Sequence, residues 1–296
     1  MADFETTLAA AAKAVETVLD QVLPKADEGP EGQLFAAMRY AALAGGKRLR
    51  PFMVLASAEM FDIPQRSAVR VGAAVELMHT YSLIHDDLPC MDDDDLRRGQ
   101  PTVHVAFDEA TAVLAGDALQ ALAFEVLADE AVSRNARIRA ELVLGLARAT
   151  GGHGMVGGQM LDLLGEHQKL TEPAIVRMQR LKTGEMIAFA VETGAVMSQA
   201  REAERHALRA YAHDLGLAFQ IADDLLDVTG TAETVGKGVN KDAAAGKATF
   251  VSLLGEAAAA ERAGMLAGQA ITHLETFGPR ADSLRALAEF VINRRA

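Results

Sequence analysis

Apolar residues recur at helical spacing along most of the chain. One such stretch is residues 68–88, where the pattern runs at steps of three, four or one through Val71, Val75, Met78, Ser82 and Leu83. Another is residues 205–228, marked at the same rhythm by Leu208, Tyr211, Leu215, Phe219 and Leu226. No hairpin dipeptide lies between alternating runs, so the pattern predicts helices and no sheet.

The composition supports the same interpretation. Alanine and leucine, which favour helix, supply much of the apolar fraction. Aromatic residues make up only 5% of the chain and tryptophan is absent, so strand-forming residues are scarce. Connections are expected at 27–32, at 61–65 and over the long glycine-rich stretch 230–247, whose length is typical of functional loops. Nothing in the composition separates two cores, so we predict one all-helical domain, residues 1–296.

Charge and cysteine content exclude several classes of function. The net charge of −12 argues against a nucleic acid partner, because phosphate backbones need a basic surface. The single cysteine, Cys90, excludes an intrachain disulfide and fits a reducing compartment. Asp3 and Glu5 stand where a signal peptide needs positive charge, and no uncharged apolar run of about 18 residues predicts a membrane span. We therefore expect a soluble cytoplasmic protein.

Two aspartate-rich stretches carry the candidate chemistry. In "FQIADDLLD" (219–227), helical geometry places Gln220, Asp223 and Asp227 along one face, with Asp224 alongside. Carboxylates stacked in this way disfavour a helix unless a cation neutralises them. Oxygen donors without histidine or cysteine favour Mg²⁺, which takes one or two carboxylates and completes its shell with water and substrate phosphate.

The stretch "SLIHDDLPCMD" (82–92) repeats this logic with an interruption. Asp86 and Asp87 close a helix that Pro89 bends or ends, and Asp92 follows in the turn. Arg97 and Arg98 come next, and their planar guanidinium groups suit phosphate oxygens. A metal-binding acidic cluster beside paired arginines predicts a diphosphate held from both sides.

Two other interpretations of the first stretch were weighed. Asp93–Asp95 alone would be an ordinary solvated surface run. A calcium loop counted from Asp92 needs glycine at its sixth position and glutamate at its twelfth, but Arg97 and Val103 stand there. The calcium interpretation therefore fails, and the repetition of the acidic pattern favours a magnesium site.

Basic residues gather in three further places. "AGGKRLRP" (44–51) puts Lys47, Arg48 and Arg50 directly after two glycines, where backbone can approach an anion closely. "LKTGE" (181–185) offers Lys182 and Thr183 in a mostly apolar neighbourhood, and three lysines follow the second acidic stretch: Lys237, Lys241 and Lys247. Together they predict room for two polyanionic substrates.

With these residues in place, the sequence resembles the trans-isoprenyl diphosphate synthases, of the bacterial farnesyl diphosphate synthase type. The resemblance spans nearly the whole chain through a series of motifs in order: "GGKRLRP", "LMHTYSLIHDDLPCMDDDDLRRGQPTVH", "GGQMLDL", "LKTGEMIAFA", "FQIADDLLDVTG" and "GKATF". It implies an all-α, single-domain bundle around a central substrate cavity, with the two aspartate motifs facing each other across its mouth, and a homodimer. The implied reaction condenses isopentenyl diphosphate head-to-tail with dimethylallyl or geranyl diphosphate.

The resemblance also assigns roles to individual residues. Mg²⁺ ions on the allylic diphosphate would be held by Asp86, Asp87, Asp92, Asp223, Asp224 and Asp227. Positive charge on the same group would come from Arg97, Lys182, Lys237 and Lys247. Thr183 and Gln220, at the allylic site, would stabilise the carbocation by their dipoles together with the Lys182 carbonyl. Isopentenyl diphosphate would be bound by Lys47, Arg50, His79 and Arg98. No protein base is assigned, because the departed diphosphate can accept the proton.

Product length is expected to depend on the floor of the cavity below the first motif. Tyr81 lies five positions before Asp86, about 7.5 Å along a helix, with Ser82 next to it. On a helical wheel Ser82 shares a face with His79 and Asp86, whereas Tyr81 lies well off it. The resemblance, rather than the wheel, makes Tyr81 the floor and predicts farnesyl diphosphate, with geranylgeranyl diphosphate as the alternative.

Three rival functions are less well supported by the motifs. A class I terpene cyclase would carry an Asn/Ser/Glu metal motif in place of the second aspartate stretch, which is intact here. A non-catalytic synthase subunit would lose an aspartate motif or a basic cluster. A Mg²⁺-dependent phosphohydrolase would need histidine–aspartate pairs downstream of His79, His85 and His104, and none is present.

Overall fold

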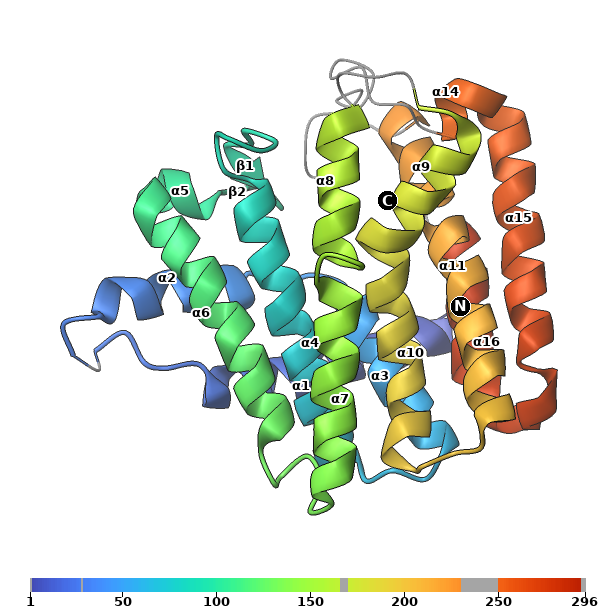
Figure 1. Ribbon diagram of the computed structural model, residues 1–296, viewed down its shortest axis with the longest axis horizontal. Coiled ribbons are helices and arrows are strands. Elements are labelled where there is room, and N and C mark those ends of the chain that lie inside the picture. The colour runs from blue at the N-terminus through green and yellow to red at the C-terminus, as the bar shows by residue number, and fades with distance from the viewer. Residues whose placement is uncertain (1, 28, 166–169, 230–249, 294–296) are drawn as a thin grey trace. The chain divides into compact units, whose positions relative to one another are not determined.

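The computed structural model describes residues 2–27, 29–165, 170–229 and 250–293, and most of them lie in helices (Figure 1). The sheet in these residues is a single hairpin of two two-residue strands, β1 (Leu96–Arg97) and β2 (Gln100–Pro101). The all-α prediction is therefore confirmed. The hairpin was not predicted, because its strands are too short to show an alternating pattern.

The chain forms two compact units, and each is described by itself. The N-terminal unit comprises Ala2–Leu55 and Ile63–Val143, and the C-terminal unit comprises Ala56–Asp62 and Leu144–Ala296. The chain passes between the units inside α3 (Leu49–Met60), in the connection that follows α3, and inside α7 (Ala136–Thr150). A single domain spanning residues 1–296 stays a prediction.

The N-terminal unit is built around α4 (Gln65–Asp86). Its other elements, besides parts of α3 and α7 and the hairpin, are α1 (Ala2–Val22), α2 (Gly32–Ala42), α5 (Val103–Ala106) and α6 (Glu109–Ala128). α4 begins directly after Pro64 and packs against α1, α2 and α6, so it is buried on almost every side. Asp108 caps α6 by accepting a 2.7 Å hydrogen bond from the Thr111 amide.

The C-terminal unit contains α11 (Glu202–Thr229), which carries the second aspartate motif. The remaining elements are α8 (Met155–Gly165), α9 (Glu172–Gln179), the π-helix η1 (Arg180–Gly184), α10 (Glu185–Met197), α14 (Phe250–Leu254), α15 (Glu256–His273), η2 (Glu275–Ala281) and α16 (Asp282–Asn293). Ala218 and Ile221 of α11 are fully buried in a core shared with Ile175, Phe250 and Ala259. This core fixes the helix that carries the motif.

The predicted helices are present at nearly the predicted bounds. The stretch 68–88 corresponds to α4 (Gln65–Asp86), and 205–228 corresponds to α11 (Glu202–Thr229). The connections expected at 27–32 and 61–65 also lie between helices, whereas 230–247 lies outside the described residues.

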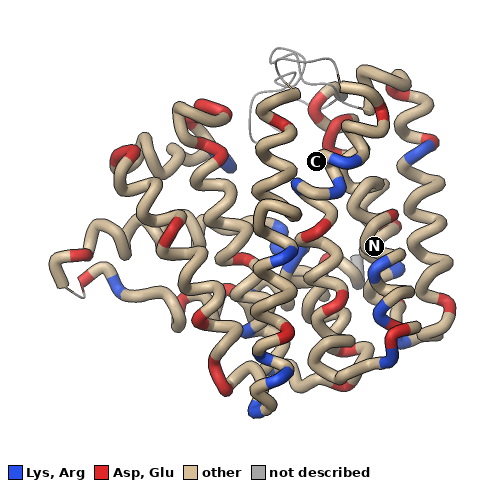
Figure 2. Tube along the Cα trace, in the orientation of Figure 1, with Lys and Arg blue, Asp and Glu red and all other residues tan. Residues whose placement is uncertain are grey.

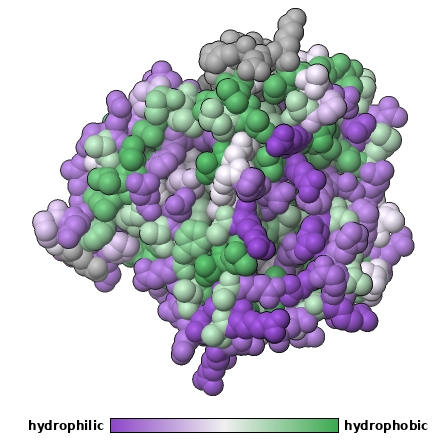
Figure 3. Space-filling view, viewed as in Figure 1, coloured by the Kyte–Doolittle hydropathy of each residue, from purple (hydrophilic) through white to green (hydrophobic). Residues whose placement is uncertain are grey.

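Helix α6 exposes two large apolar side chains. Val113 and Leu114 are 39% and 56% exposed. The same region shows as hydrophobic in the space-filling view, over α5 and the first part of α6 (Figure 3). Among the described helices, α6 alone is long and apolar enough to cross a membrane, by length and composition only, and 44% of that window is buried inside the protein. The core helix of a soluble protein passes the same test, so the prediction of no membrane span stays a prediction.

Candidate active site

Helix α4 ends at the first aspartate motif, as the position of Pro89 predicts. Asp86 is its last residue, and Asp87 caps it. The following loop folds back on the helix end, because the Asp92 amide donates to the Asp86 carbonyl at 2.9 Å and the Asp94 amide donates to the Asp87 carbonyl at 3.3 Å. The structure therefore brings Asp86 and Asp92 together. Figure 2 shows acidic positions gathered in this loop.

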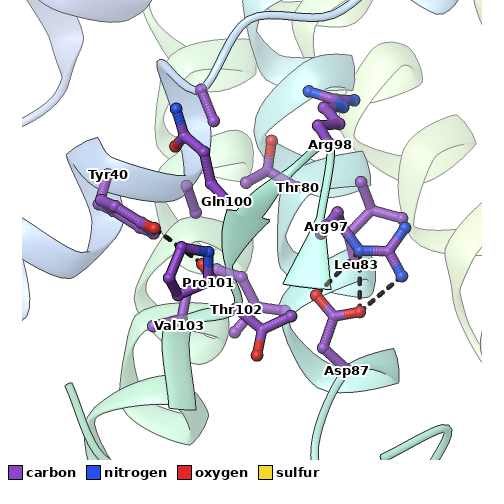
Figure 4. A pocket seen from close by; sticks show the side chains of 13 residues that line it. Tyr40, Thr80, Leu83, Asp87, Arg97, Arg98, Gln100, Pro101, Thr102 and Val103 are labelled. Carbon is purple, nitrogen blue, oxygen red and sulfur yellow. Dashed lines mark hydrogen bonds and ion pairs between the residues drawn. The ribbon is translucent and has the colours of Figure 1, made fainter. Parts of the chain in front are cut away.

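The Asp87 carboxylate is held by Arg97 (Figure 4). Arg97 Nε donates to both carboxylate oxygens at 2.8 and 2.9 Å, and Arg97 Nη2 donates to Oδ1 at 2.6 Å. Asp87 is buried, and burial raises its pKa, whereas the hydrogen bonds and charge of Arg97 act in the opposite direction. Arg97 therefore supports the ionised form of a carboxylate that its surroundings disfavour.

Arg98 lies at the turn of the small hairpin. Arg98 and Gly99 have φ angles of 54° and 76°, the pair of left-handed conformations that a type I′ turn requires. The Arg98 guanidinium donates to the Gly45 carbonyl, and a Cβ at residue 46 would lie 2.7 Å from the Arg98 Cζ. Gly46 thus leaves room for Arg98 on the 44–47 loop, and this docking joins two of the predicted basic motifs.

His79 and Arg50 are in contact within the same unit. Arg50 Nη1 lies 3.3 Å from His79 Nε2, and since guanidinium only donates, this imidazole nitrogen is the acceptor. Burial holds the pKa of His79 well below its ordinary value, and the nearby charges of Arg50 and Arg98 lower it further. His79 is therefore neutral at pH 7. Lys47, the fourth residue predicted for isopentenyl diphosphate, is exposed on the neighbouring loop.

Arg48 has a structural role that the sequence did not reveal. It is 3% exposed, and its Nη1 lies 2.5 Å from the Glu76 Oε1, which is also buried. Its Nη2 donates to the Ala42 carbonyl at 2.8 Å, and its Nε lies 3.3 Å from Glu16. Of the three basic residues in "KRLR", the middle one thus anchors the loop inside the unit. No local spacing connects Arg48 to Glu76, so only the structure shows the pair.

A cleft opens between α2, α4 and the hairpin, all within the N-terminal unit (Figure 4). Its volume is about 450 Å³ when the open solvent at its mouth is included. Arg97, Arg98 and Asp87 contribute its charged groups, and Leu83, Ile84 and Val103 contribute apolar surface. Tyr40 closes one side by donating to the Pro101 carbonyl at 2.7 Å.

The two residues predicted for the cavity floor differ in their surroundings. Tyr81 is 8% exposed, and its ring meets the His85 imidazole edge-to-face with centroids 5.1 Å apart. Ser82 is half-buried, and its hydroxyl donates to the His79 carbonyl at 2.8 Å. The bulk at this level of α4 therefore comes from Tyr81.

The C-terminal unit places the other predicted residues around a π-helix. Lys182 and Thr183 lie in η1 (Arg180–Gly184), a wide turn of the kind that often occurs at functional sites. A Cβ at residue 158 would lie 2.1 Å from the Lys182 amide nitrogen, so α8 reaches this turn only because Gly158 has no side chain. Lys182 Nζ lies 2.6 Å from Asp162 of α8, a partner within the motif "GGQMLDL" to which the sequence assigned no role.

A chain of hydrogen bonds joins η1 to the second aspartate motif. Thr183 donates to Gln220 Oε1 at 3.2 Å, and Gln220 Nε2 donates to Asp224 Oδ1 at 3.1 Å. The Phe250 amide donates to the other Asp224 oxygen at 3.2 Å. Asp224 and Asp227 are 3% and 7% exposed, whereas Asp223 is half-buried. The structure thus brings Thr183, Gln220 and Asp224 together.

Three lysines predicted on the loop after α11 lie outside the described residues: Lys237, Lys241 and Lys247. Their placement therefore stays a prediction.

The donor groups fit Mg²⁺ that is shared with a diphosphate. Within the described parts of the chain, no three His, Cys, Asp or Glu side chains converge closely enough to hold a metal ion by themselves. Mg²⁺ needs only one or two protein carboxylates when phosphate oxygens complete its shell. The half-buried carboxylates of Asp86, Asp92 and Asp223 meet that requirement.

Comparison with known proteins identifies the family. The sequence profile of the family described as "Polyprenyl synthetase" matches residues 31–273. The chain belongs to this family. It is 42% identical to the farnesyl diphosphate synthase of Haemophilus influenzae, over 95% of this chain and 97% of that protein. It is 47% identical to the farnesyl diphosphate synthase of Escherichia coli, over 87% of this chain and 88% of that protein. Polyprenyl synthetase membership also confirms the resemblance found in the motifs.

Solved structures agree with this family. The crystal structure of an FPP/GFPP synthase from Zymomonas mobilis is similar with a TM-score of 0.89 and 48% sequence identity, covering 98% of this chain and 99% of that one. At this identity and coverage the similarity extends over the elements that carry both aspartate motifs.

Proposed function

We propose that this chain is a farnesyl diphosphate synthase, which joins isopentenyl diphosphate head-to-tail to dimethylallyl or geranyl diphosphate. The observation that carries the proposal is the set of charged groups at the end of α4. There the acidic turn of Asp86 and Asp92 lies beside the guanidinium of Arg97, within one unit that also holds Arg98 and His79. The relatives of this chain that are named farnesyl diphosphate synthase support the same reaction.

The basic residues divide between two diphosphates. Arg97 and Lys182, each already paired with a carboxylate, would bind the allylic diphosphate, together with Lys237 and Lys247. Isopentenyl diphosphate would be bound by Lys47, Arg50, His79 and Arg98. A neutral His79 suits this task, because an imidazole N–H can donate to phosphate while the arginines supply the charge.

The aspartates divide by exposure. Asp86, Asp92 and Asp223 are half-buried and would carry most of the contact with Mg²⁺. Asp87 and Asp224 already accept hydrogen bonds at both carboxylate oxygens, so they position Arg97 and Gln220 in addition to any metal contact. Asp227, buried one turn further along α11, completes the predicted set. When bound, Mg²⁺ would neutralise charge that develops on the departing diphosphate.

The carbocation left by diphosphate departure needs dipoles and a dry pocket, not a nucleophile. Thr183 and Gln220 supply oriented dipoles, because each is fixed by the hydrogen-bond chain that ends on Asp224. The Lys182 carbonyl lies in the same wide turn. The departed diphosphate accepts the proton that leaves after coupling, so no protein base takes part.

Tyr81 sets the product length in this proposal, with Ser82 beside it. A buried aromatic ring one and a half turns below Asp86 blocks further growth of an apolar chain and stops synthesis at C15. Geranylgeranyl diphosphate is the alternative product.

We also propose a homodimer in the cytoplasm. The exposed apolar residues of α6, Val113 and Leu114, offer a surface that a second copy would cover. The single cysteine is consistent with a reducing compartment.

A product assay tests the function. Purified protein is given labelled isopentenyl diphosphate with dimethylallyl or geranyl diphosphate, in Mg²⁺ and in excess chelator. A C15 product that requires Mg²⁺ is expected. A C20 product would support the same condensation reaction but would make geranylgeranyl diphosphate the product. Cyclised hydrocarbon from geranyl or farnesyl diphosphate would indicate a terpene cyclase, and the absence of any turnover would indicate a non-catalytic subunit.

A further inference from the structure

One face of α6 receives the part of α4 that lies just below the first aspartate motif. Val113, Gly116 and Gln120 recur on α6 at steps of three and four, so they share a face. Tyr81 and His85 stand four residues apart on α4 and both contact this face. The two helices therefore meet at the level where the growing product would end.

His85 fits into a notch on α6 that exists because residue 116 is glycine. Its Nε2 lies 3.0 Å from the Val113 carbonyl, and since a carbonyl only accepts, this nitrogen carries the proton. A Cβ at residue 116 would lie 2.1 Å from the same nitrogen. The colliding atom is the tip of a side chain, so an alanine here displaces the imidazole while both helix backbones stay in place.

Tyr81 is held by His85. The His85 imidazole packs edge-to-face against the Tyr81 ring, with centroids 5.1 Å apart. Burial, followed by the charges of Asp86 and Asp117, raises the phenol pKa. The hydroxyl is therefore neutral, and the position of the His85 imidazole constrains the orientation of the ring.

We propose that Gly116 of α6 is a positioning residue for product length, acting through His85 on the ring of Tyr81. The proposal rests on the proposed function, because it concerns where that reaction stops. Displacement of His85 removes the ring that holds Tyr81, and the Tyr81 side chain then turns. This change opens the floor without altering any residue that contacts a diphosphate.

The plain alternative is that these residues only pack α4 against α6. In that case their substitution would lower the stability of the protein and leave the product unchanged. Product length measured beside stability separates the two interpretations.

The experiment compares C20 with C15 product from a single reaction of isopentenyl and geranyl diphosphate. We expect Gly116→Ala to raise the C20 fraction by about tenfold, the lower end of what a small change in an apolar pocket does to discrimination. Tyr81→Ala, which removes the floor directly, is expected to raise the C20 fraction at least as much. The double variant Tyr81→Ala/Gly116→Ala should add little to Tyr81→Ala, because both changes act on one side chain.

The control for Gly116→Ala must also add one methyl group inside a helix. Gly264→Ala on α15 is the matched control, because a Cβ there meets nothing within 4 Å, and its product should stay at C15. Thermal unfolding of each variant reports stability separately.

A folded Gly116→Ala variant that keeps the wild-type product ratio would overturn the proposal while leaving the proposed function intact. A wild-type protein that condenses nothing would overturn the proposed function itself.

Discussion

Asp87 and Arg97 lie ten positions apart and meet through three hydrogen bonds of 2.6–2.9 Å, in a fork that fixes the plane of the guanidinium. This arrangement leaves the outer edge of Arg97 oriented by protein rather than by substrate. Preorganised guanidinium loses less conformational freedom on binding a diphosphate than a mobile one does.

Asp87→Asn is expected to act through Arg97. Loss of a charged hydrogen-bond partner is worth about 1.5–3 kcal/mol, so kcat/KM for geranyl diphosphate should fall roughly 10- to 100-fold. The Mg²⁺ concentration for half-maximal rate should change little in this variant and rise in the matched variant Asp86→Asn. Steady-state kinetics over a Mg²⁺ series measure both. Equal increases in the two variants would instead make Asp87 a direct metal ligand.

Arg97→Gln provides the second side of a double-mutant cycle. When it is combined with Asp87→Asn, the loss in kcat/KM, expressed as free energy, should be smaller than the sum of the losses in the two single variants. The reason is that each single change already removes the Asp87–Arg97 interaction. Additive losses would mean that the two residues act independently.

Glu76→Ala is expected to destabilise the N-terminal unit strongly. Arg48 would keep its buried charge without its closest partner, and breaking a buried ion pair in this way typically costs about 3–5 kcal/mol. Glu16→Ala is the matched control, since Glu16 pairs with the same arginine but its side chain is 39% exposed, and it should cost at most about 1 kcal/mol. Urea unfolding measures the free energy of unfolding of both variants. Similar losses in the two variants would contradict the conclusion that Glu76 is the more important partner of Arg48.

The burial of His79 predicts that the free energy of unfolding decreases in acid. Burial and four arginines hold its pKa in the folded protein well below that of the unfolded chain, which is about 6.5. Between these two pKa values the unfolded chain binds more protons, so the contribution is complete above about pH 6.5 and is lost as the pH falls below it.

The measurement compares wild type with His79→Gln. The free energy of unfolding should drop more in the wild type between about pH 7.5 and about pH 5.5, because other titrating groups cancel in the comparison. An equal drop in both proteins would show that His79 titrates normally.

Gly158→Ala is expected to damage the turn that carries Lys182 and Thr183. The new Cβ would meet a backbone nitrogen at 2.1 Å, and backbone cannot rotate away as a side chain can. Overpacking of this kind usually costs about 1–3 kcal/mol, and turnover should fall with the displaced turn. Gly264→Ala is again the control. A Gly158→Ala variant with wild-type turnover would show that catalysis does not depend on the position of η1.

The sequence predicted the long helices well because their patterns are local. A 3.6-residue period identified α4 and α11 within three residues of their ends, and Pro89 marked where the first motif leaves its helix. Spacing and residue type also singled out the acidic motifs and both arginines, whereas the roles of Thr183 and Gln220 came from the family resemblance, and all these roles stay predictions.

Other features depend on contacts between distant parts of the chain. The Arg48–Glu76 pair spans 28 positions and the Lys182–Asp162 pair spans 20, and no periodicity links their members. The π-helix and the two-residue hairpin are too short to produce a pattern of their own. Such pairings are decided by tertiary packing, which a single sequence does not display.

The turn at Arg98–Gly99 has a mechanical consequence. Arg97 reaches the Asp87 carboxylate while its neighbour Arg98 reaches the Gly45 carbonyl, so adjacent side chains leave one short ribbon in different directions. In the proposed reaction one of them holds the electrophilic partner and the other holds the nucleophilic partner. Because both arginines stand on the same hairpin, neither contact can move independently of the other. Any shift of the hairpin changes the alignment of both reactants at once.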